Sequence, residues 1–286
     1  MKKIIYLILF LFLLSSCKKE VKWPWSSETK TEQSGGDYKN LPYPQIHASA
    51  KVGEYVLVPP AIFLRTLSAG NLDSIYLAFY PRKCIEVGDA YSKVQDYDTV
   101  LTVPNAFIIP IPAGQKAHKG DIVLTWWQGG SGMQRAYVTD ATNPYKPEVK
   151  YLDFDWLWED AQFKVTGQLD SNTFVVINKP FQPGSSVAYL NGGSYEFYKV
   201  INVYEDKVMA FSWSGKLAIF DKKECLPNEI HPQVQPGDSV FVPFYGIYTP
   251  AIVDEIKDGL VISEFDFFGK IHKVKNPICD IRKTLP

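Results

Sequence analysis

The sequence predicts an all-β protein made of several small antiparallel barrels, and three observations lead to this prediction. Aromatic residues make up 14% of the 286 residues, and the chain contains 19 glycines and 20 prolines, a composition that favours short strands and tight turns over long helices. Apolar and polar residues alternate with a period of two, with turn formers about every 8 to 12 residues. The chain also repeats itself. No segment beyond the N-terminus shows helical periodicity.

The N-terminus has the pattern of an export signal. Lys2 and Lys3 precede an apolar run, residues 4–14, and small residues follow before Cys17. The run is too short to span a membrane. The segment "LLSSC" resembles the lipobox of bacterial lipoproteins, which implies that residues 1–16 are a signal peptide and that Cys17 becomes the lipidated first residue. The alternatives are an ordinary secretory signal or a buried core segment.

Residues 17–45 are polar and nearly without aliphatic side chains, so we expect a flexible tether between lipid and fold. The lipobox resemblance implies a lipid-anchored protein of the cell envelope. We expect the outer membrane rather than the inner one, and the sequence leaves open whether the protein faces the periplasm or the cell surface.

Three cysteines remain beyond Cys17, namely Cys84, Cys225 and Cys279. An odd number means that at least one thiol is unpaired. A disulfide or a metal site is one interpretation. We favour three equivalent, small, buried positions, because no CxxC occurs and the separations do not match a zinc pattern.

Two pairs of segments show the internal repetition. "IHASAKVGEYVLVP" from Ile46 aligns without a gap with "IHPQVQPGDSVFVP" from Ile230. "NAFIIPIPAGQKAHKGDIVLTWWQGGSG" from Asn105 and "NTFVVINKPFQPGSSVAYLNGGSY" from Asn172 share an apolar strand, a Pro/Gly passage, a short strand and a Gly-Gly turn. We therefore expect duplicated structural units.

Each unit begins with a glycine-polar turn and a strand, continues with a longer strand and ends with two shorter strands. The predicted units are residues 46–100, 101–168, 169–229 and 230–286, and the first is the least regular. A barrel of about 50 residues has little core of its own, so neighbouring units are expected to pack together in pairs.

The fourth unit resembles a Tudor-like module, an SH3-like barrel of the Tudor/Agenet group. The residues that carry the resemblance are Gly237, Asp238, Val240, Tyr248, Ala251, Ile252, Val253, Val261, Phe265, Asp266, Phe267, Gly269 and Val274. The match covers about 40 residues and recurs more faintly in the second and third units. It implies tandem SH3-like/Tudor-like barrels.

In Tudor-like modules, aromatic side chains of two loops can form a cage for a methylated cation. The resemblance places such a cage at Tyr245 or Tyr248 with Phe265 and Phe267 in the fourth unit, and at Tyr195, Phe211 and Trp213 in the third. Departures from the family pattern make a methylated ligand doubtful. The alternative, which we favour, is that these rings fill the barrels or the seams between them.

The sequence contains none of the common catalytic or nucleotide-binding motifs, and we predict no cofactor and no metal. His47 and His231 occupy equivalent repeat positions, so we expect them to cap turns or to pack between units. Asp153 and Asp155 lie two residues apart, and such a pair of carboxylates could serve glycoside hydrolysis. For these two residues and for Asp266, we favour ordinary acidic residues of turns or strand edges.

Two groups of tryptophans are candidates for ligand contact: Trp126 with Trp127, and Trp156 with Trp158. Neighbouring residues of a strand face opposite sides, so one of an adjacent pair is expected in the core and the other exposed. Exposed Trp and Tyr faces can stack on sugar rings.

The sequence therefore predicts a non-catalytic binding protein. A protein or peptide of the envelope is the expected partner, held by grooves between barrels and by aromatic faces. The alternative is a carbohydrate or peptidoglycan ligand on exposed Trp and Tyr, and a glycosidase is the least favoured hypothesis. The formal net charge of −1 provides no basic patch, which argues against nucleic acid as a partner.

Overall fold

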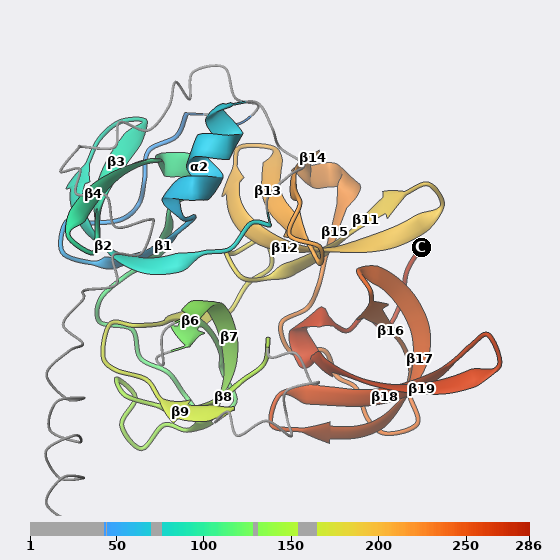
Figure 1. Cartoon of the computed structure of the whole chain (residues 1–286). Helices are drawn as coiled ribbons and strands as arrows, with labels where there is room; N and C mark the ends of the chain where they lie inside the picture. Colours follow the sequence, from blue (N-terminus) through green and yellow to red (C-terminus); the bar gives the residue numbers. More distant parts are fainter. Residues whose placement is uncertain (1–42, 44, 70–75, 128–130, 154–164) are drawn as a thin grey trace, which may run out of the picture. The chain divides into compact units, whose positions relative to one another are not determined.

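The computed structural model describes residues 43, 45–69, 76–127, 131–153 and 165–286. The predicted signal peptide, Cys17 and nearly all of the predicted tether lie outside the described residues, as do Asp155, Trp156 and Trp158. The described chain is predominantly β, and its strands form three antiparallel sheets (Figure 1). None of its helices is long and apolar enough to cross a membrane.

The first two repeats each form one five-stranded sheet with the same strand order. The first contains β1 (Tyr55–Val58), β2 (Tyr80–Val87), β3 (Tyr91–Asp96), β4 (Thr99–Pro104) and β5 (Ile109–Ile111), ordered β4-β3-β2-β1-β5. The second contains β6 (Ile122–Trp127), β7 (Ser131–Asp140), β8 (Glu148–Tyr151), β9 (Thr166–Gln168) and β10 (Val175–Ile177), ordered β10-β6-β7-β8-β9. In both repeats the fifth strand returns to pair with the first.

The third and fourth repeats follow the same order and share one nine-stranded sheet. The third contains β11 (Ser186–Asn191), β12 (Ser194–Tyr204), β13 (Lys207–Ser212), β14 (Leu217–Asp221) and β15 (Cys225–Pro227). The fourth contains β16 (Ser239–Phe244), β17 (Ile247–Lys257), β18 (Leu260–Phe267) and β19 (Lys270–Pro277). The two halves join where Glu196 of β12 pairs with Ile247 of β17. No sheet closes into a barrel among the described strands.

A glycine turn opens the first strand of every repeat and is fastened to the second strand in the same way. The glycine N–H donates to a carbonyl of the second strand in the pairs Gly53–Cys84, Gly120–Val138, Gly184–Val200 and Gly237–Val253, at 2.8–2.9 Å. At Gly53, φ is +88°, a conformation that glycine adopts without steric cost. The predicted glycine-polar turn is therefore a structural element of all four repeats.

The second strand of every repeat carries a β-bulge directly after that bonded residue. The register shifts lie between Cys84 and Glu86, Val138 and Asp140, Val200 and Asn202, and Val253 and Glu255. A bulge bends a strand and increases its twist. The same bend in the same place indicates four copies of one structural unit.

Short helical turns precede the closing segment in three repeats. They are η2 (Asn105–Phe107), η4 (Lys222–Glu224) and η5 (Ile278–Asp280). The side chain of the buried Asn105 donates to the carbonyls of Gly88 and Asp89, at 2.9 and 3.1 Å. Asn172, its match in the sequence, lies in the turn before β10. The second pair of repeated segments therefore occupies equivalent places.

Strand pairing extends the first two repeats beyond the boundaries predicted at residues 100 and 168. The first boundary falls inside β4, and the closing strands β5 and β10 lie beyond both boundaries. The reason is that a closing strand pairs with the first strand of its own repeat, a contact between residues far apart in the sequence.

The expectation of no helix beyond the signal is wrong, because α2 (Ala61–Ser68) lies in the irregular part of the first repeat. Its buried residues are Phe63, Leu64 and Leu67, which form one apolar stripe. A helix of two turns is too short for its periodicity to stand out, and tertiary packing rather than propensity stabilises it.

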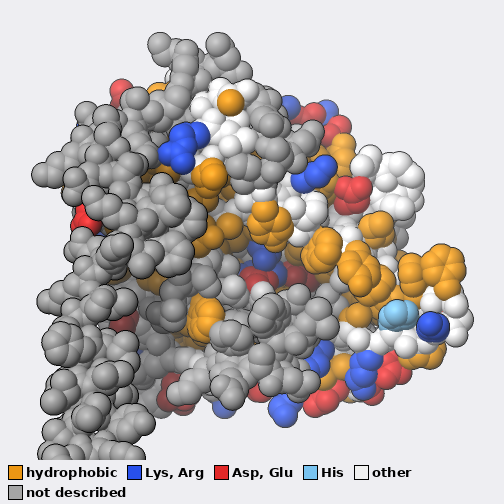
Figure 2. All heavy atoms as spheres, viewed as in Figure 1, with side chains coloured by type: hydrophobic (Ala, Val, Ile, Leu, Met, Phe, Trp, Pro, Cys, Tyr) orange, Lys and Arg blue, Asp and Glu red, His pale blue; other side chains and the backbone are white. Residues whose placement is uncertain are grey.

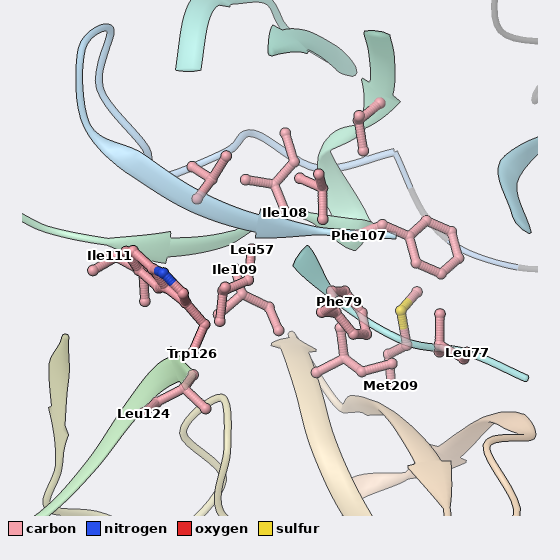
Figure 3. Close-up of a cluster of buried hydrophobic side chains, with 14 of the residues drawn as sticks. Leu57, Leu77, Phe79, Phe107, Ile108, Ile109, Ile111, Leu124, Trp126 and Met209 are labelled. Carbon is pink, nitrogen blue, oxygen red and sulfur yellow. The ribbon is translucent and has the colours of Figure 1, made fainter. Parts of the chain in front are cut away.

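The largest cluster of buried apolar side chains is centred on the first repeat and receives side chains from the other three. Figure 3 shows Leu57 and Ile109 beside Leu124 and Trp126 of the second repeat and Met209 of the third. Smaller clusters lie within the second, third and fourth repeats. The repeats therefore share a core, but not in the predicted pairs, because the largest cluster draws on all four repeats.

Cys84, Cys225 and Cys279 are buried and unbridged, as favoured from the sequence. They are not equivalent positions, however. Cys84 lies in the second strand of its repeat, Cys225 in a fifth strand and Cys279 in η5. Burial raises the pKa of Cys225 to about 11 and that of Cys279 to about 12, so both thiols are neutral at physiological pH.

Candidate binding surface

Six aromatic residues of the third and fourth repeats form a contiguous patch, four of them exposed and two half-buried, which we call the aromatic surface. Its members are Trp213, Phe244, Tyr245, Phe267, Phe268 and His272. Figure 2 shows hydrophobic side chains gathered beside a histidine over the region of β17–β19. Trp213, Tyr245 and Phe268 are 56%, 69% and 91% exposed.

Two tight hairpin turns present the most exposed rings. Tyr245-Gly246 joins β16 to β17, and Phe268-Gly269 joins β18 to β19. Both residues of each turn have positive φ, for example +53° at Phe268 and +77° at Gly269, as a type I′ turn requires. The first position of such a turn favours Asn, Asp or Gly, and a bulky aromatic residue there is a steric outlier. Strain of this kind clusters at functional sites.

Trp213 brings the third repeat into the aromatic surface. Its ring lies 5.5 Å from that of Tyr245, at an interplanar angle of 87°. A Cβ built on Gly246 would lie 3.1 Å from the Trp213 Cβ, so a glycine here allows the close approach. The surface therefore depends on how the third and fourth repeats meet.

Phe244 lies at the centre of the aromatic surface and fills the space between its neighbours. Its ring centroid is 4.4 Å from Tyr245, 4.9 Å from Phe265, 5.6 Å from Phe267 and 5.7 Å from His272. A cation cage needs an open space between rings, and here the rings pack on one another. The arrangement is a ridged apolar surface rather than a cage.

The predicted residues of the fourth repeat separate into two groups. Tyr245 and Phe267 are exposed members of the aromatic surface, and Phe265 is buried beneath it, stacked on His272 at 5.7 Å. Tyr248 is buried elsewhere, and its hydroxyl accepts a hydrogen bond from the Asn228 amide at 2.8 Å. Burial raises the pKa of Tyr248, which suits a neutral structural hydroxyl.

The three predicted residues of the third repeat do not form one site. Only Trp213 belongs to the aromatic surface. The Tyr195 hydroxyl donates to the carbonyl of Pro286 at 3.3 Å, and the Phe211 ring lies 6.2 Å from Phe79 of the first repeat. Tyr195 and Phe211 therefore serve contacts within the fold.

The adjacent tryptophans of the second repeat present no broad exposed face. Trp126 is 7% exposed and packs against Tyr55 at 5.0 Å. Trp127 is half-buried and packs against the core of its own repeat. Trp126 is thus the core member of the pair, and Trp127 is the more exposed one.

Asp153 belongs to a buried charge cluster and is not the turn or edge acid that we favoured. The Arg135 guanidinium donates to Asp153 Oδ1 at 2.6 Å and to Asp280 Oδ1 at 2.6 Å. Lys199 Nζ lies 3.0 Å from Asp153 Oδ1, and Arg135 also donates to Ser186 Oγ at 3.0 Å. The cluster joins the second, third and fourth repeats, and its two cations balance its two carboxylates.

The ionisation of Asp153 argues against a general acid at this position. Burial alone would raise the pKa of Asp153, but Arg135 and then Lys199 outweigh that effect and hold the pKa well below its usual value. A glycosidase acid needs a raised pKa. Asp266, by contrast, is a turn acid as expected, since its carboxylate accepts the Gly269 N–H at 2.8 Å.

The two repeated histidines do not pack between units. The His47 side chain is 79% exposed and lies 3.9 Å from the carboxylate of Asp89, and His231 is also exposed. Of the two predicted roles, packing between units is wrong for both, and turn capping stays a prediction. Among the described residues, no group of three or more His, Cys, Asp and Glu side chains could hold a metal ion.

Sequence reasoning missed Phe244, Phe268 and His272 as members of the aromatic surface. One signal for Phe268 is visible in the sequence: "DFFGK" places an aromatic residue directly before a turn glycine, where Asn or Asp is usual. No protein-family model matches this sequence, and no curated protein is significantly similar to it.

Proposed function

We propose that this chain is a non-catalytic lipoprotein of the cell envelope that binds a protein or peptide partner through its aromatic surface. In this proposal Cys17 carries the lipid, the following residues form a tether, and the four repeats are divergent SH3-like/Tudor-like barrels. The outer membrane is the proposed location.

The strand order supports the SH3-like part of the proposal. In each repeat the closing segment pairs with the first strand, and strands one to four follow one another as a meander. A short helical turn precedes the closing segment in three repeats, which fits an SH3-like barrel. The repeated bulge supplies the bend by which a small sheet curls on itself.

The aromatic surface is the observation that carries the binding proposal. Monomeric proteins seldom expose a contiguous apolar patch without a function, and Trp and Tyr are the residues most enriched at binding hot spots. Phe268 and Tyr245 are held at strained turn positions while largely exposed to solvent. Tyr97 shares this strain and exposure, so it is the contiguity of the rings in the aromatic surface that favours binding.

The ring geometry favours a protein partner over a glycan. A sugar ring stacks best on an open, flat aromatic face. Trp213 and Tyr245 are nearly perpendicular, and Phe267 and Phe268 lie at 69° to each other. Such ridges suit the side chains of a peptide or a protein surface.

The proposal is tested by affinity capture from a detergent-solubilised envelope with the full-length chain as bait. We expect one stoichiometric protein partner, and at least about tenfold less of it with Phe268→Ser, as for the loss of a hot-spot residue. Tyr97→Ser is the matched control. Tyr97 occupies the equivalent turn of the first repeat, has φ +53° and is 83% exposed.

Three outcomes would contradict the proposal. Equal capture by the wild type, Phe268→Ser and Tyr97→Ser would show that the aromatic surface is not the binding site. Retention on insoluble peptidoglycan that is lost with Trp213→Ala would favour the glycan alternative. Turnover of a glycan that disappears with Asp153→Asn would favour an enzyme.

A further inference from the structure

A cleft of about 510 Å³ lies at the junction of the first three repeats, away from the aromatic surface. Its volume falls in the range of ligand sites. Val175, Val176, Asn178, Lys179 and Gln182 are among the residues that line it. No carboxylate is among its described lining residues, and Lys179 is the one charged side chain there.

The edge of a sheet faces this cleft. Among the described strands, β10 is the outermost of the sheet ordered β10-β6-β7-β8-β9, and its Val175 and Val176 line the cleft. The backbone N–H and C=O groups on the outer side of an edge strand have no strand partner and can pair with another chain. β10 is therefore a template for one more strand.

The side-chain amide of Gln182 covers this edge. Its Nε2 donates to the Val176 carbonyl at 2.6 Å, and its Oε1 accepts the Asn178 N–H at 3.2 Å. These are the two backbone groups that one residue of a parallel neighbouring strand would engage, since it donates to the carbonyl of residue i and accepts from the N–H of residue i+2. The Gln182 side-chain amide thus takes the place of one residue of such a strand.

We infer that the outer edge of β10 is a second binding site, at which an extended segment of a partner protein pairs with Val176 and Asn178 and displaces the Gln182 amide. The segment adds a strand to the sheet, a common mode of peptide recognition. Apolar side chains suit the floor of Val175, Pro110 and Pro183. A basic segment is disfavoured, because Lys179 lines the cleft and no acid does. The inference rests on the proposed function only in taking the partner to be a protein.

The experiment titrates the ¹⁵N-labelled full-length chain with an acetylated, amidated hexapeptide of alternating threonine and valine. We expect the Val176 and Asn178 amide signals to shift. Gln182→Ala removes the competing amide and should tighten binding by about tenfold, as for two modest hydrogen bonds. Gln95→Ala is the matched control and should leave the dissociation constant unchanged, because the Gln95 amide also donates to backbone carbonyls, those of Tyr97 and Thr99, but lies outside the cleft.

A second probe keeps the test decisive if Gln182→Ala folds poorly. Two N-methylated versions of the hexapeptide are used, one methylated at the odd-numbered residues and the other at the even-numbered residues. Strand addition predicts that one set abolishes the shifts of the wild-type chain and the other does not. Binding that is indifferent to both sets, or unchanged by Gln182→Ala, would overturn the inference.

The site is also separable from the aromatic surface. Phe268→Ser should leave the hexapeptide titration unchanged, because the cleft contains no residue of the fourth repeat. If the hexapeptide instead shifts the Trp213 indole signal and leaves Asn178 unmoved, the cleft fails as a site while the proposed function stands.

Discussion

The charge cluster around Arg135 and the aromatic surface are both made by residues from different repeats, but one is buried and the other exposed. Arg135 is 1% exposed and fully paired with carboxylates, whereas the ring of Phe268 is 91% exposed. The repeats share their turns and bulges. They differ in the residues that contact another repeat and in the residues that are exposed to solvent. The contacts that join the repeats and the proposed binding surface are therefore made by residues that the repeats do not share.

Breaking the buried cluster should have the largest effect. Arg135→Ala leaves the carboxylates of Asp153 and Asp280 buried without their main cation, and removing one partner of a buried ion pair costs about 3–5 kcal/mol. This is a large part of the stability of a typical domain. Urea denaturation should show a much lower midpoint.

Lys273→Ala is the control for this prediction. The Lys273 ammonium pairs with Asp254 and, at 3.4 Å, with Glu264, but the side chains are about half exposed. An exposed ion pair is screened by solvent and contributes little to stability. If Arg135→Ala costs no more than Lys273→Ala, the cluster does not hold the repeats together.

Acid should weaken the buried cluster. The pKa of Asp153 is lower in the folded chain than the usual value near 4, so its stabilisation is complete above about pH 4 and is lost as the pH falls further. We expect a loss on the order of 2 kcal/mol in the free energy of unfolding on strong acidification. Asp153→Asn should remove much of this pH dependence. An identical acid profile in that variant would assign the loss to other carboxylates.

The sequence predicts the repeated framework well because its signals are local. Gly53 and Gly237 mark turns whose chemistry is fixed by their neighbours, and the strands of the fourth repeat alternate clearly. The helix α2 escapes prediction because it is short. The strands β5 and β10 are predicted as apolar strands but assigned to the wrong repeats, because a closing strand is defined by its distant partner.

The site is only partly predictable, because it depends on contacts between repeats. Tyr245 and Phe267 follow from the family resemblance, but Trp213 joins them only through the interface of the third and fourth repeats. Arg135 lies in a strand, "MQRAYV", where it looks like an ordinary solvent-facing residue. Its burial follows from carboxylates 18 and 145 residues away.

The smallest effect concerns the turns themselves, since two of the three type I′ turns of the fourth repeat differ in their chemistry. Asp258-Gly259 has the residues that such a turn favours, and Phe268-Gly269 has an aromatic residue at φ +53°. Phe268→Asn should relieve backbone strain of at least about 1 kcal/mol and lose part of the ring contact with Phe267, for a net gain of about 0.5 kcal/mol in stability. Asp258→Asn should change the denaturation midpoint little.

The sign of that change decides what Phe268 is for. A gain in stability together with weaker partner capture would mean that the turn gives up folding free energy to present a ring to a partner, as binding sites often do. A loss of stability with Phe268→Asn would mean that the ring serves the fold, and the exposed turn would then give no support to a binding role for the aromatic surface.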